Sequence, residues 1–224
     1  QVVDTTQGFD PAALLPAIAG VTQDQMPGYL SLVPTQLVQC LDAGDQVIDA
    51  LRSLSAILVG GAAISQNLLQ RALDAGLKVR TTYGMTETSG GCVYDGEPMP
   101  GVTIRAVDWD GRTRLAIHGP TLMTRYLDAE SPFFDEGGHR WLLTGDLGII
   151  RASGTVEVRG RADDVIVSGG LSIAPGPVRR AVRSFEGVAD AWIMATPDEK
   201  WGHVVTALVV PEQVPADSLE MAEL

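Results

Sequence analysis

The stretch from Thr81 to Gly91, TTYGMTETSGG, concentrates groups that could bind a phosphorylated ligand. Thr86 and Thr88 offer hydroxyls where phosphate oxygens could sit. Glu87, between them, offers a hard oxygen ligand for Mg²⁺, which proteins bind through one or two carboxylates plus substrate phosphates. Gly84 and Gly90 carry no side chain, so the backbone there can approach a ligand closely. Taken alone, the motif is more typical of a capped polar turn after a buried strand.

Three further sites could bind a nucleotide. Asp146, in LLTGDLG, comes just after a predicted buried strand, and its acceptor-only carboxylate suits the two hydroxyls of a ribose; the alternative is a helix or turn cap. Arg161 is a permanent cation, with a surface salt bridge as its alternative. GGAA, residues 60–63, is a tight turn between a strand and a helix. It is no GxGxxG fingerprint, which argues against a dinucleotide fold.

The elements around TTYGMTETSGG predict how these groups are positioned. Residues 54–61 (LSAILVGG) predict a buried strand, residues 65–76 a helix with Ser65 as N-cap and Gly76 as stop, and residues 77–84 a second strand. The apolar face of this helix is predicted from Ile64, Leu68, Leu69, Ala72 and Leu73. A strand, a helix and a strand over this length form a βαβ unit with parallel strands. The loops at 60–63 and 83–88 then lie side by side at the edge where open α/β sheets bind ligands.

The rest of the chain predicts shorter elements. A helix begins with Asp10 as N-cap and Pro11 in its first turn. A short strand broken at Pro34 follows, and then a helix that ends at Gly44. Two hairpins are predicted, one at 102–119 that turns at Asp110–Gly111 and one at 140–160 that turns at Ser153–Gly154. The last predicted elements are a helix at 174–185 and paired strands at 188–195 and 203–210. A domain boundary is predicted between Arg161 and Asp164.

Composition narrows the possible partners. The 28 acidic and 16 basic residues give a net charge of −12, which argues against nucleic acid, since phosphate backbones need clustered Lys and Arg. No apolar run approaches the roughly 20 residues of a membrane-spanning helix, so no membrane insertion is expected. Cys40 and Cys92 predict neither a disulfide framework nor a metal site, and favour a reduced cytoplasmic protein. The three histidines show no triad or metal spacing. Since no signal-like segment follows Gln1, we expect the natural start to lie elsewhere.

Four phrases in order carry a family resemblance: GGAAI (60–64), TYGMTETSGG (82–91), LLTGDLG (142–148) and GRADDVIVSGG (160–170). Together they resemble the acyl-adenylating superfamily of acyl-CoA synthetases, adenylation domains and luciferases. Within it, SLVPTQL, TSGGCVYDGEPMPGV and SGGLSIAPGPV are most similar to the o-succinylbenzoate–CoA ligases of menaquinone biosynthesis in their actinobacterial form.

The resemblance implies an α/β fold. It consists of the C-terminal part of a large adenylate-forming domain (residues 1–160, a βαβ unit plus short β hairpins) and a small, incomplete, mobile α+β domain (residues 161–224). The implied activity joins a small-molecule carboxylate to ATP with Mg²⁺, giving an acyl-adenylate, and then transfers the acyl group to CoA.

The resemblance also implies roles for individual residues. Thr86 and Glu87 are catalytic, with Glu87 as the metal ligand. Asp163 is the hinge between the two domains. The implied nucleotide-binding residues are Gly60, Gly61, Ala62, Ala63, Tyr83 (stacked on adenine), Gly84, Thr86, Asp146 and Arg161; Ser89, Gly90, Gly91 and Cys92 line the acyl pocket, and Gly169 and Gly170 line the CoA path.

Several features depart from the family pattern. Lys78 and Lys200 are the only lysines, and neither matches a family lysine, so the chain is expected to be a fragment, inactive alone. TRLAIHG lacks the usual Glu before the strand, and Arg125 stands where a Gly commonly precedes Tyr126. The alternatives are a CoA ligase for another aryl or fatty acid, and a noncatalytic nucleotide-binding module. A peptide-synthetase adenylation domain is less favoured. The oligomeric state stays open, with a homo-oligomer among the alternatives.

Overall fold

The computed structural model describes residues 8–23 and 27–212. These residues divide into two compact units. The first contains the residues up to Val102 together with Gly119–Glu130, and the second contains Thr103–His118 together with the residues from Ser131 onward. The predicted boundary between a larger domain ending at residue 160 and a smaller one beginning at 161 stays a prediction.

A five-stranded sheet forms the centre of the first unit. Its strands, in spatial order, are β1 (Tyr29–Leu32), β2 (Ala56–Val59), β3 (Val79–Met85), β4 (Gly90–Tyr94) and β5 (Glu97–Pro98). The pairs β1–β2 and β2–β3 are parallel, whereas β3–β4 and β4–β5 are antiparallel. The predicted βαβ unit is therefore confirmed, since β2 and β3 are parallel neighbours joined through a helix.

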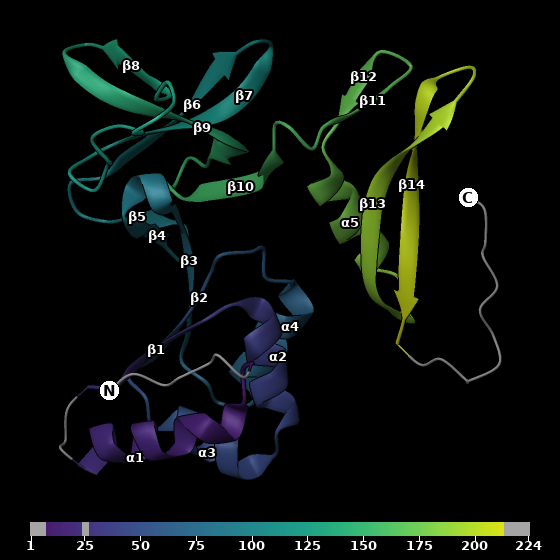
Figure 1. Cartoon of the computed structure of the whole chain (residues 1–224). Coiled ribbons are helices and arrows are strands. Elements are labelled where there is room, and N and C mark those ends of the chain that lie inside the picture. Colours follow the sequence, from purple (N-terminus) through teal and green to yellow (C-terminus); the bar gives the residue numbers. More distant parts are fainter. Residues whose placement is uncertain (1–7, 24–26, 213–224) are drawn as a thin grey trace. The chain divides into compact units, whose positions relative to one another are not determined.

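Helices gather around the parallel strands of this sheet (Figure 1). They are the 3₁₀ turn η1 (Pro11–Ala13), α1 (Leu14–Gln23), α2 (Pro34–Asp42), α3 (Asp45–Arg52) and α4 (Gln66–Asp74). The predicted caps are confirmed. The Asp10 carboxylate accepts from the Ala12 N–H at 2.9 Å, and the Ser65 hydroxyl accepts from the Leu68 N–H at 3.1 Å. Fully buried side chains such as Leu37, Leu51 and Ile57 form the core between helices and sheet.

The predicted apolar face of α4 is only partly right. Ala72 is fully buried, and Leu68 and Leu69 pack against the core. Leu73, however, is 46% exposed. Successive helix residues point about 100° apart, so Leu73 lies beside the buried stripe instead of within it.

The second unit begins with an antiparallel sheet. Its strands are β6 (Thr103–Trp109), β7 (Arg112–His118), β8 (Phe133–Glu136), β9 (His139–Ile150) and β10 (Val156–Arg161), in the order β10-β9-β7-β6 with β8 also paired to β9. Both predicted hairpins are confirmed. The two-residue turn between β6 and β7 has positive φ at Asp110 (52°) and Gly111 (70°), as a type I′ hairpin turn requires.

The remaining described residues form smaller elements, which are β11 (Ile166–Ser168), β12 (Leu171–Ile173), α5 (Pro175–Arg183), β13 (Val188–Asp198) and β14 (Gly202–Pro211). The predicted pairing of the last two strands is confirmed, and α5 packs against them (Figure 1). Arg179 Nη2 donates to both carboxylate oxygens of Asp190, at 2.9 and 2.8 Å. Burial acts to raise the pKa of Asp190. Hydrogen bonds from Arg179 and the Ala191 N–H, together with the charges of Arg179 and Arg183, outweigh it and hold that pKa below its usual value.

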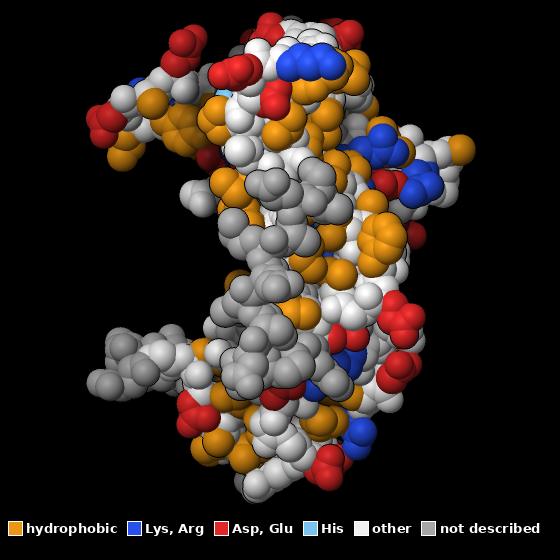
Figure 2. Space-filling model, turned by 90° about the vertical axis from the view of Figure 1, so that its right-hand side faces the viewer, with side chains coloured by type: hydrophobic (Ala, Val, Ile, Leu, Met, Phe, Trp, Pro, Cys, Tyr) orange, Lys and Arg blue, Asp and Glu red, His pale blue; other side chains and the backbone are white. Residues whose placement is uncertain are grey.

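The surface mixes charges of both signs, and Figure 2 shows acidic side chains scattered among basic ones on the face in view. Cys40 and Cys92 are free and buried. Among the described residues, no helix combines the length and apolarity needed to cross a membrane.

Candidate functional site

The TET motif forms a short turn at the end of β3. Residues Thr86–Thr88 make one 3₁₀ turn, η2, and the chain then returns along β4. Thr86 is exposed and Glu87 is half-buried. Gly60, which follows β2, lies so close to β3 that an added Cβ would meet Thr82 Oγ1 at 2.1 Å. The structure thus brings the GGAA and TYGMTET segments to the same edge of the parallel strands, as the βαβ unit predicted.

Thr88 corrects one expectation. Its side chain was predicted to offer a hydroxyl to phosphate, but Thr88 is 1% exposed. Its Oγ1 accepts from the Met85 N–H at 2.9 Å and lies within donating distance of the Gly90 and Met85 carbonyls, at 2.7 and 3.0 Å. The hydroxyl is consumed in closing the turn, which leaves Thr86 as the exposed threonine of the motif.

Gly84 is required by the neighbouring strand. A Cβ at Gly84 would lie 2.0 Å from the Gly90 carbonyl oxygen, so the sheet leaves no room for a side chain there, and the predicted contact of Gly84 with a nucleotide stays a prediction. Gly90 has φ of 109° and open space around it. Its missing side chain is explained by the backbone conformation.

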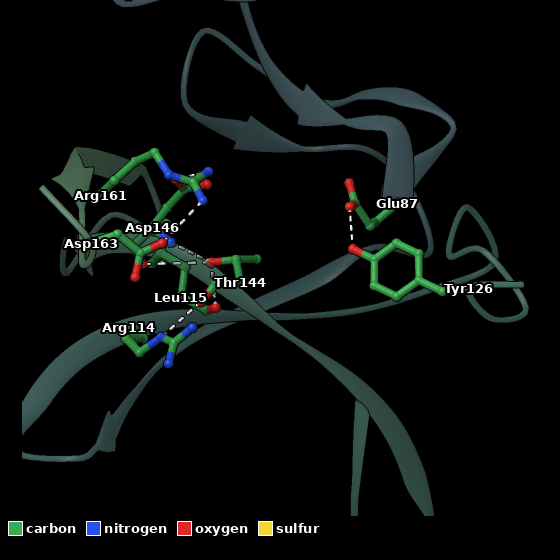
Figure 3. A network of polar contacts seen from close by, with 8 residues as sticks. All are labelled: Glu87, Arg114, Leu115, Tyr126, Thr144, Asp146, Arg161 and Asp163. Carbon is green, nitrogen blue, oxygen red and sulfur yellow. Dashed lines mark hydrogen bonds and ion pairs between the residues drawn. The ribbon is translucent and has the colours of Figure 1, made fainter. Parts of the chain in front are cut away.

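Glu87 is held by a segment that the sequence did not connect to it. The Tyr126 hydroxyl donates to Glu87 Oε1, as the right side of Figure 3 shows. The Met123 N–H donates to the Glu87 carbonyl at 2.8 Å, and the Ser89 hydroxyl donates to the Thr121 carbonyl at 2.9 Å. The hydrogen bond to Glu87, followed by burial, raises the pKa of Tyr126. The sequence carries no direct signal for this contact. It shows only a tyrosine, whose hydroxyl finds a hydrogen-bond partner when it is buried.

Glu87 suits a hard cation bound with one protein carboxylate. The described residues contain no group of three or more His, Cys, Asp or Glu side chains that could hold a metal by themselves. Mg²⁺ does not require such a cage, because it keeps several waters and takes substrate phosphates as ligands. The Tyr126 bond fixes one carboxylate oxygen and so orients the second. The residues present therefore fit Mg²⁺ held together with a phosphorylated substrate.

The residues predicted to line an acyl pocket differ in accessibility. Ser89 and Gly90 are exposed, Gly91 is half-buried and Cys92 is fully buried. Burial raises the pKa of the Cys92 thiol above its usual value, although a hydrogen bond with Thr88 opposes this. A buried, protonated thiol is a poor nucleophile, so Cys92 is not suited to a catalytic role. The pocket itself stays a prediction.

Asp146 and Arg161 are cross-strand neighbours in the second unit. Asp146 lies inside the long strand β9, not after a strand as predicted, and is 7% exposed. It pairs in register with Arg161 at the end of β10, and their side chains approach to 3.6 Å (Figure 3, left). The Asp146 N–H donates to Thr144 Oγ1 at 3.1 Å. A buried carboxylate beside a permanent cation is a suitable acceptor for sugar hydroxyls.

Arg114 supports this pair from β7. Its Nε donates to the Thr144 carbonyl at 2.8 Å, and the Thr144 hydroxyl donates to the Leu115 carbonyl at 2.8 Å. Arg114 belongs to TRLAIHG, the segment that departs from the family pattern. In this chain Arg114 of that segment ties β7 to the strand that carries Asp146.

The predicted hinge and CoA-path residues lie after β10. Asp163 is exposed in a turn, with its carboxylate 3.5 Å from Arg161. Gly169 and Gly170 form the two-residue turn between β11 and β12, with φ of 54° and 82°. A Cβ at Gly169 would meet the Trp201 ring at 2.4 Å, so both turn geometry and Trp201 require glycine there. An ordinary two-residue turn therefore explains why glycine stands at these positions, and the CoA role stays a prediction.

These features define an adenylate-forming fold, and comparison with known proteins gives the same class. The profile of the AMP-binding enzyme family matches residues 2–127, and the chain belongs to that family.

Individual relatives show which members of this family the chain is similar to. A probable 2-succinylbenzoate–CoA ligase of Mycobacterium tuberculosis is 39% identical over 222 residues, covering 97% of this chain and 56% of that relative. The o-succinylbenzoate CoA synthetase of Bacillus subtilis, solved with the acyl-adenylate intermediate OSB-AMP, is 28% identical with a TM-score of 0.73; the match covers 94% of this chain and 46% of that one. The same synthetase solved with ATP and magnesium ion gives 27% identity and a TM-score of 0.71, covering 93% and 46%. The chain thus spans about half the length of the relatives it matches.

Proposed function

We propose that this chain is part of an AMP-forming acid–CoA ligase, with o-succinylbenzoate as the acid. The observation that carries the proposal is the turn at the end of β3, where Thr86 is exposed and Glu87 is held by Tyr126. Support for the acid comes from the relatives, since the Mycobacterium protein is named for 2-succinylbenzoate and the Bacillus synthetase was solved with OSB-AMP.

The proposed reaction has two steps. A carboxylate oxygen of the acid attacks the α-phosphorus of ATP, and pyrophosphate leaves with the electron pair of the broken P–O bond. The thiolate of CoA then attacks the acyl carbonyl carbon, AMP leaves, and the thiol proton goes to solvent. The first step requires the reacting groups to be aligned and phosphate charge to be offset.

Residues of the first unit would bind the base, the phosphates and the metal. Tyr83 and the segment Gly60–Ala63 would flank adenine, and the exposed hydroxyl of Thr86 would donate to a phosphate oxygen. When bound to Glu87, Mg²⁺ would offset charge on the phosphates. Tyr126 would keep the Glu87 carboxylate correctly oriented, because its hydroxyl donates to Glu87 Oε1.

Residues of the second unit would bind the ribose and support movement. Asp146 would accept both ribose hydroxyls, with Arg161 as a neighbouring cation 3.6 Å away. Asp163, exposed in its turn, would be the hinge, and Gly169–Gly170 would line the CoA path. Ser89, Gly90, Gly91 and Cys92 would form part of the acyl wall. Two buried free thiols, Cys40 and Cys92, support a location in the reducing cytoplasm.

We further propose that the 224-residue chain alone does not form the adenylate. Neither of its two lysines matches a family lysine. Lys78 Nζ donates to the Leu54 carbonyl at 2.9 Å, and Lys200 is exposed beside the Trp201 ring, 4.7 Å away. Lys78 is thus engaged within its own unit, and Lys200 does not stand where the family pattern has a lysine.

ATP–pyrophosphate exchange with o-succinylbenzoate tests these proposals. The longer natural protein should catalyse exchange and then form the CoA thioester, and Glu87→Gln should lower exchange by at least about 100-fold through loss of charge stabilisation. The 224-residue chain should show background exchange only. Robust exchange by that chain would contradict its inactivity. If the longer protein prefers another acid in a panel of aryl and fatty carboxylates, that acid is the substrate in place of o-succinylbenzoate. If no acid supports exchange, the result favours the noncatalytic nucleotide-binding module.

A further inference from the structure

Ala162, the residue before the proposed hinge, is held by hydrogen bonds on both sides. Its N–H donates to the Gly145 carbonyl at 2.7 Å, and its carbonyl accepts from Arg112 Nη1 at 2.6 Å. Ala162 is 4% exposed, whereas the Asp163 side chain is 78% exposed. The chain therefore changes from a firmly held backbone to an exposed turn within one residue.

We infer that Arg112 is a positioning residue that fixes the point at which the chain turns at Asp163. The inference rests on the proposed function in so far as Asp163 is a hinge. The Ala162 carbonyl belongs to the planar peptide group that also contains the Asp163 nitrogen. The hydrogen bond from Arg112 holds the whole plane, so the first backbone torsions beyond it are φ and ψ of Asp163. They lie in a turn that the Val165 N–H closes through a longer bond of 3.4 Å to the same oxygen. Hinges absorb large torsional changes at a few element-terminal residues, and here Arg112 determines which residues those are.

The geometry of β7 explains why an arginine can do this. Arg112 and Arg114 are both half-buried with an exposed Thr113 between them, so the two side chains share one face of the strand. Arg114 reaches the Thr144 carbonyl on β9, and Arg112 reaches beyond β10 to Ala162. The first arginine supports the strand that carries Asp146, and the second supports the peptide group that begins the turn.

Proteolysis of the 224-residue chain tests the inference without any enzymatic activity. A protease that cleaves before Asp can cut the Ala162–Asp163 bond only when this backbone is released. Arg112→Met keeps the aliphatic stem and removes the donor, so cleavage should become about tenfold faster, since a charge-assisted hydrogen bond is lost. Arg112→Lys keeps one donor and should give a rise of a few fold. Arg151→Met is the matched control, because Arg151 pairs with Glu157 on the adjoining β9–β10 hairpin and is 60% exposed; its cleavage should not change.

Hydrogen exchange of the Ala162 amide should rise in parallel with cleavage in the Arg112 variants. Wild-type cleavage in folded Arg112→Met would overturn the inference. If Arg112→Met does not accumulate as folded protein, Arg112→Lys is used instead, and cleavage of this variant at the wild-type rate would overturn the inference.

The longer protein adds a functional readout. If Arg112 positions the hinge, Arg112→Met should lower the rate of CoA-dependent thioester formation at least about fivefold more than the rate of ATP–pyrophosphate exchange, because the small mobile domain would have to turn about Asp163 between the two steps. Equal losses in both steps would assign Arg112 a merely structural role. If the longer wild-type protein has no ligase activity while Arg112→Met still speeds cleavage, the proposed function fails and the anchoring of Ala162 stands.

Discussion

Thr86 and Thr88 have the same side chain two residues apart, yet Thr86 is exposed whereas Thr88 is buried. Thr88→Val keeps the shape of the side chain but removes the acceptor of the Met85 N–H and the donor to the Gly90 carbonyl. Leaving a buried polar group unpaired costs roughly 1 to 3 kcal/mol, so we expect the free energy of unfolding to fall by about 2 to 3 kcal/mol. Thr86→Val removes only an exposed hydroxyl and should stay within about 0.5 kcal/mol of wild type.

Urea unfolding followed by circular dichroism suits this comparison. Helices α1 to α4 belong to the first unit and α5 to the second, so the helical signal reports mainly on the first unit. The four tryptophans lie in the second unit, where their fluorescence reports on unfolding: Trp109, Trp141, Trp192 and Trp201. Thr88→Ser, which keeps the hydroxyl and loses one methyl group, should cost only about 1 kcal/mol. A Thr88→Val variant as stable as Thr86→Val would refute the assignment of the Thr88 hydroxyl to the closure of the turn.

Two further predictions concern packing and ionisation. Gly84→Ala would place a Cβ 2.0 Å from the Gly90 carbonyl oxygen, so it should cost about 3 kcal/mol or more by the helical signal in urea. Gly111→Asn, in open space at φ of 70° in the second unit, should cost less than about 1 kcal/mol by tryptophan fluorescence. Burial raises the pKa of Cys40 from 9.0 to about 11 and also raises that of Cys92, so native protein at pH 8 should react with iodoacetamide far more slowly than unfolded protein. Because the unfolded thiols lose their protons first, the free energy of unfolding should fall as pH rises from 9 towards 11; labelling of native protein at the unfolded rate would contradict this.

Much of the fold is local enough to be predicted. The βαβ unit, the capping residues Asp10 and Ser65, and the Asp110–Gly111 turn all follow from short-range stereochemistry, which acts in the same way in any protein. The four ordered motifs also predicted the family. Leu73 was misassigned because helical periodicity gives the direction of a stripe but not its width.

The partners of the site residues required the tertiary structure. In the β9–β10 hairpin, an uninterrupted register would place Gly160 opposite Asp146, but a β-bulge between Val158 and Gly160 shifts the pairing by one residue and brings Arg161 there instead. Nothing in the local sequence specifies that shift.

The sequence by itself determined which side chains have the chemistry for phosphate, metal and ribose, and that two of the segments carrying them follow adjacent parallel strands. Only the tertiary structure decided which of them are accessible and what holds them. It buried Thr88, left Thr86 exposed, and joined Glu87 to Tyr126 across 39 residues of chain. The physical reason is that residue type and spacing act over a few residues, whereas burial and hydrogen-bond partners depend on segments brought together by packing.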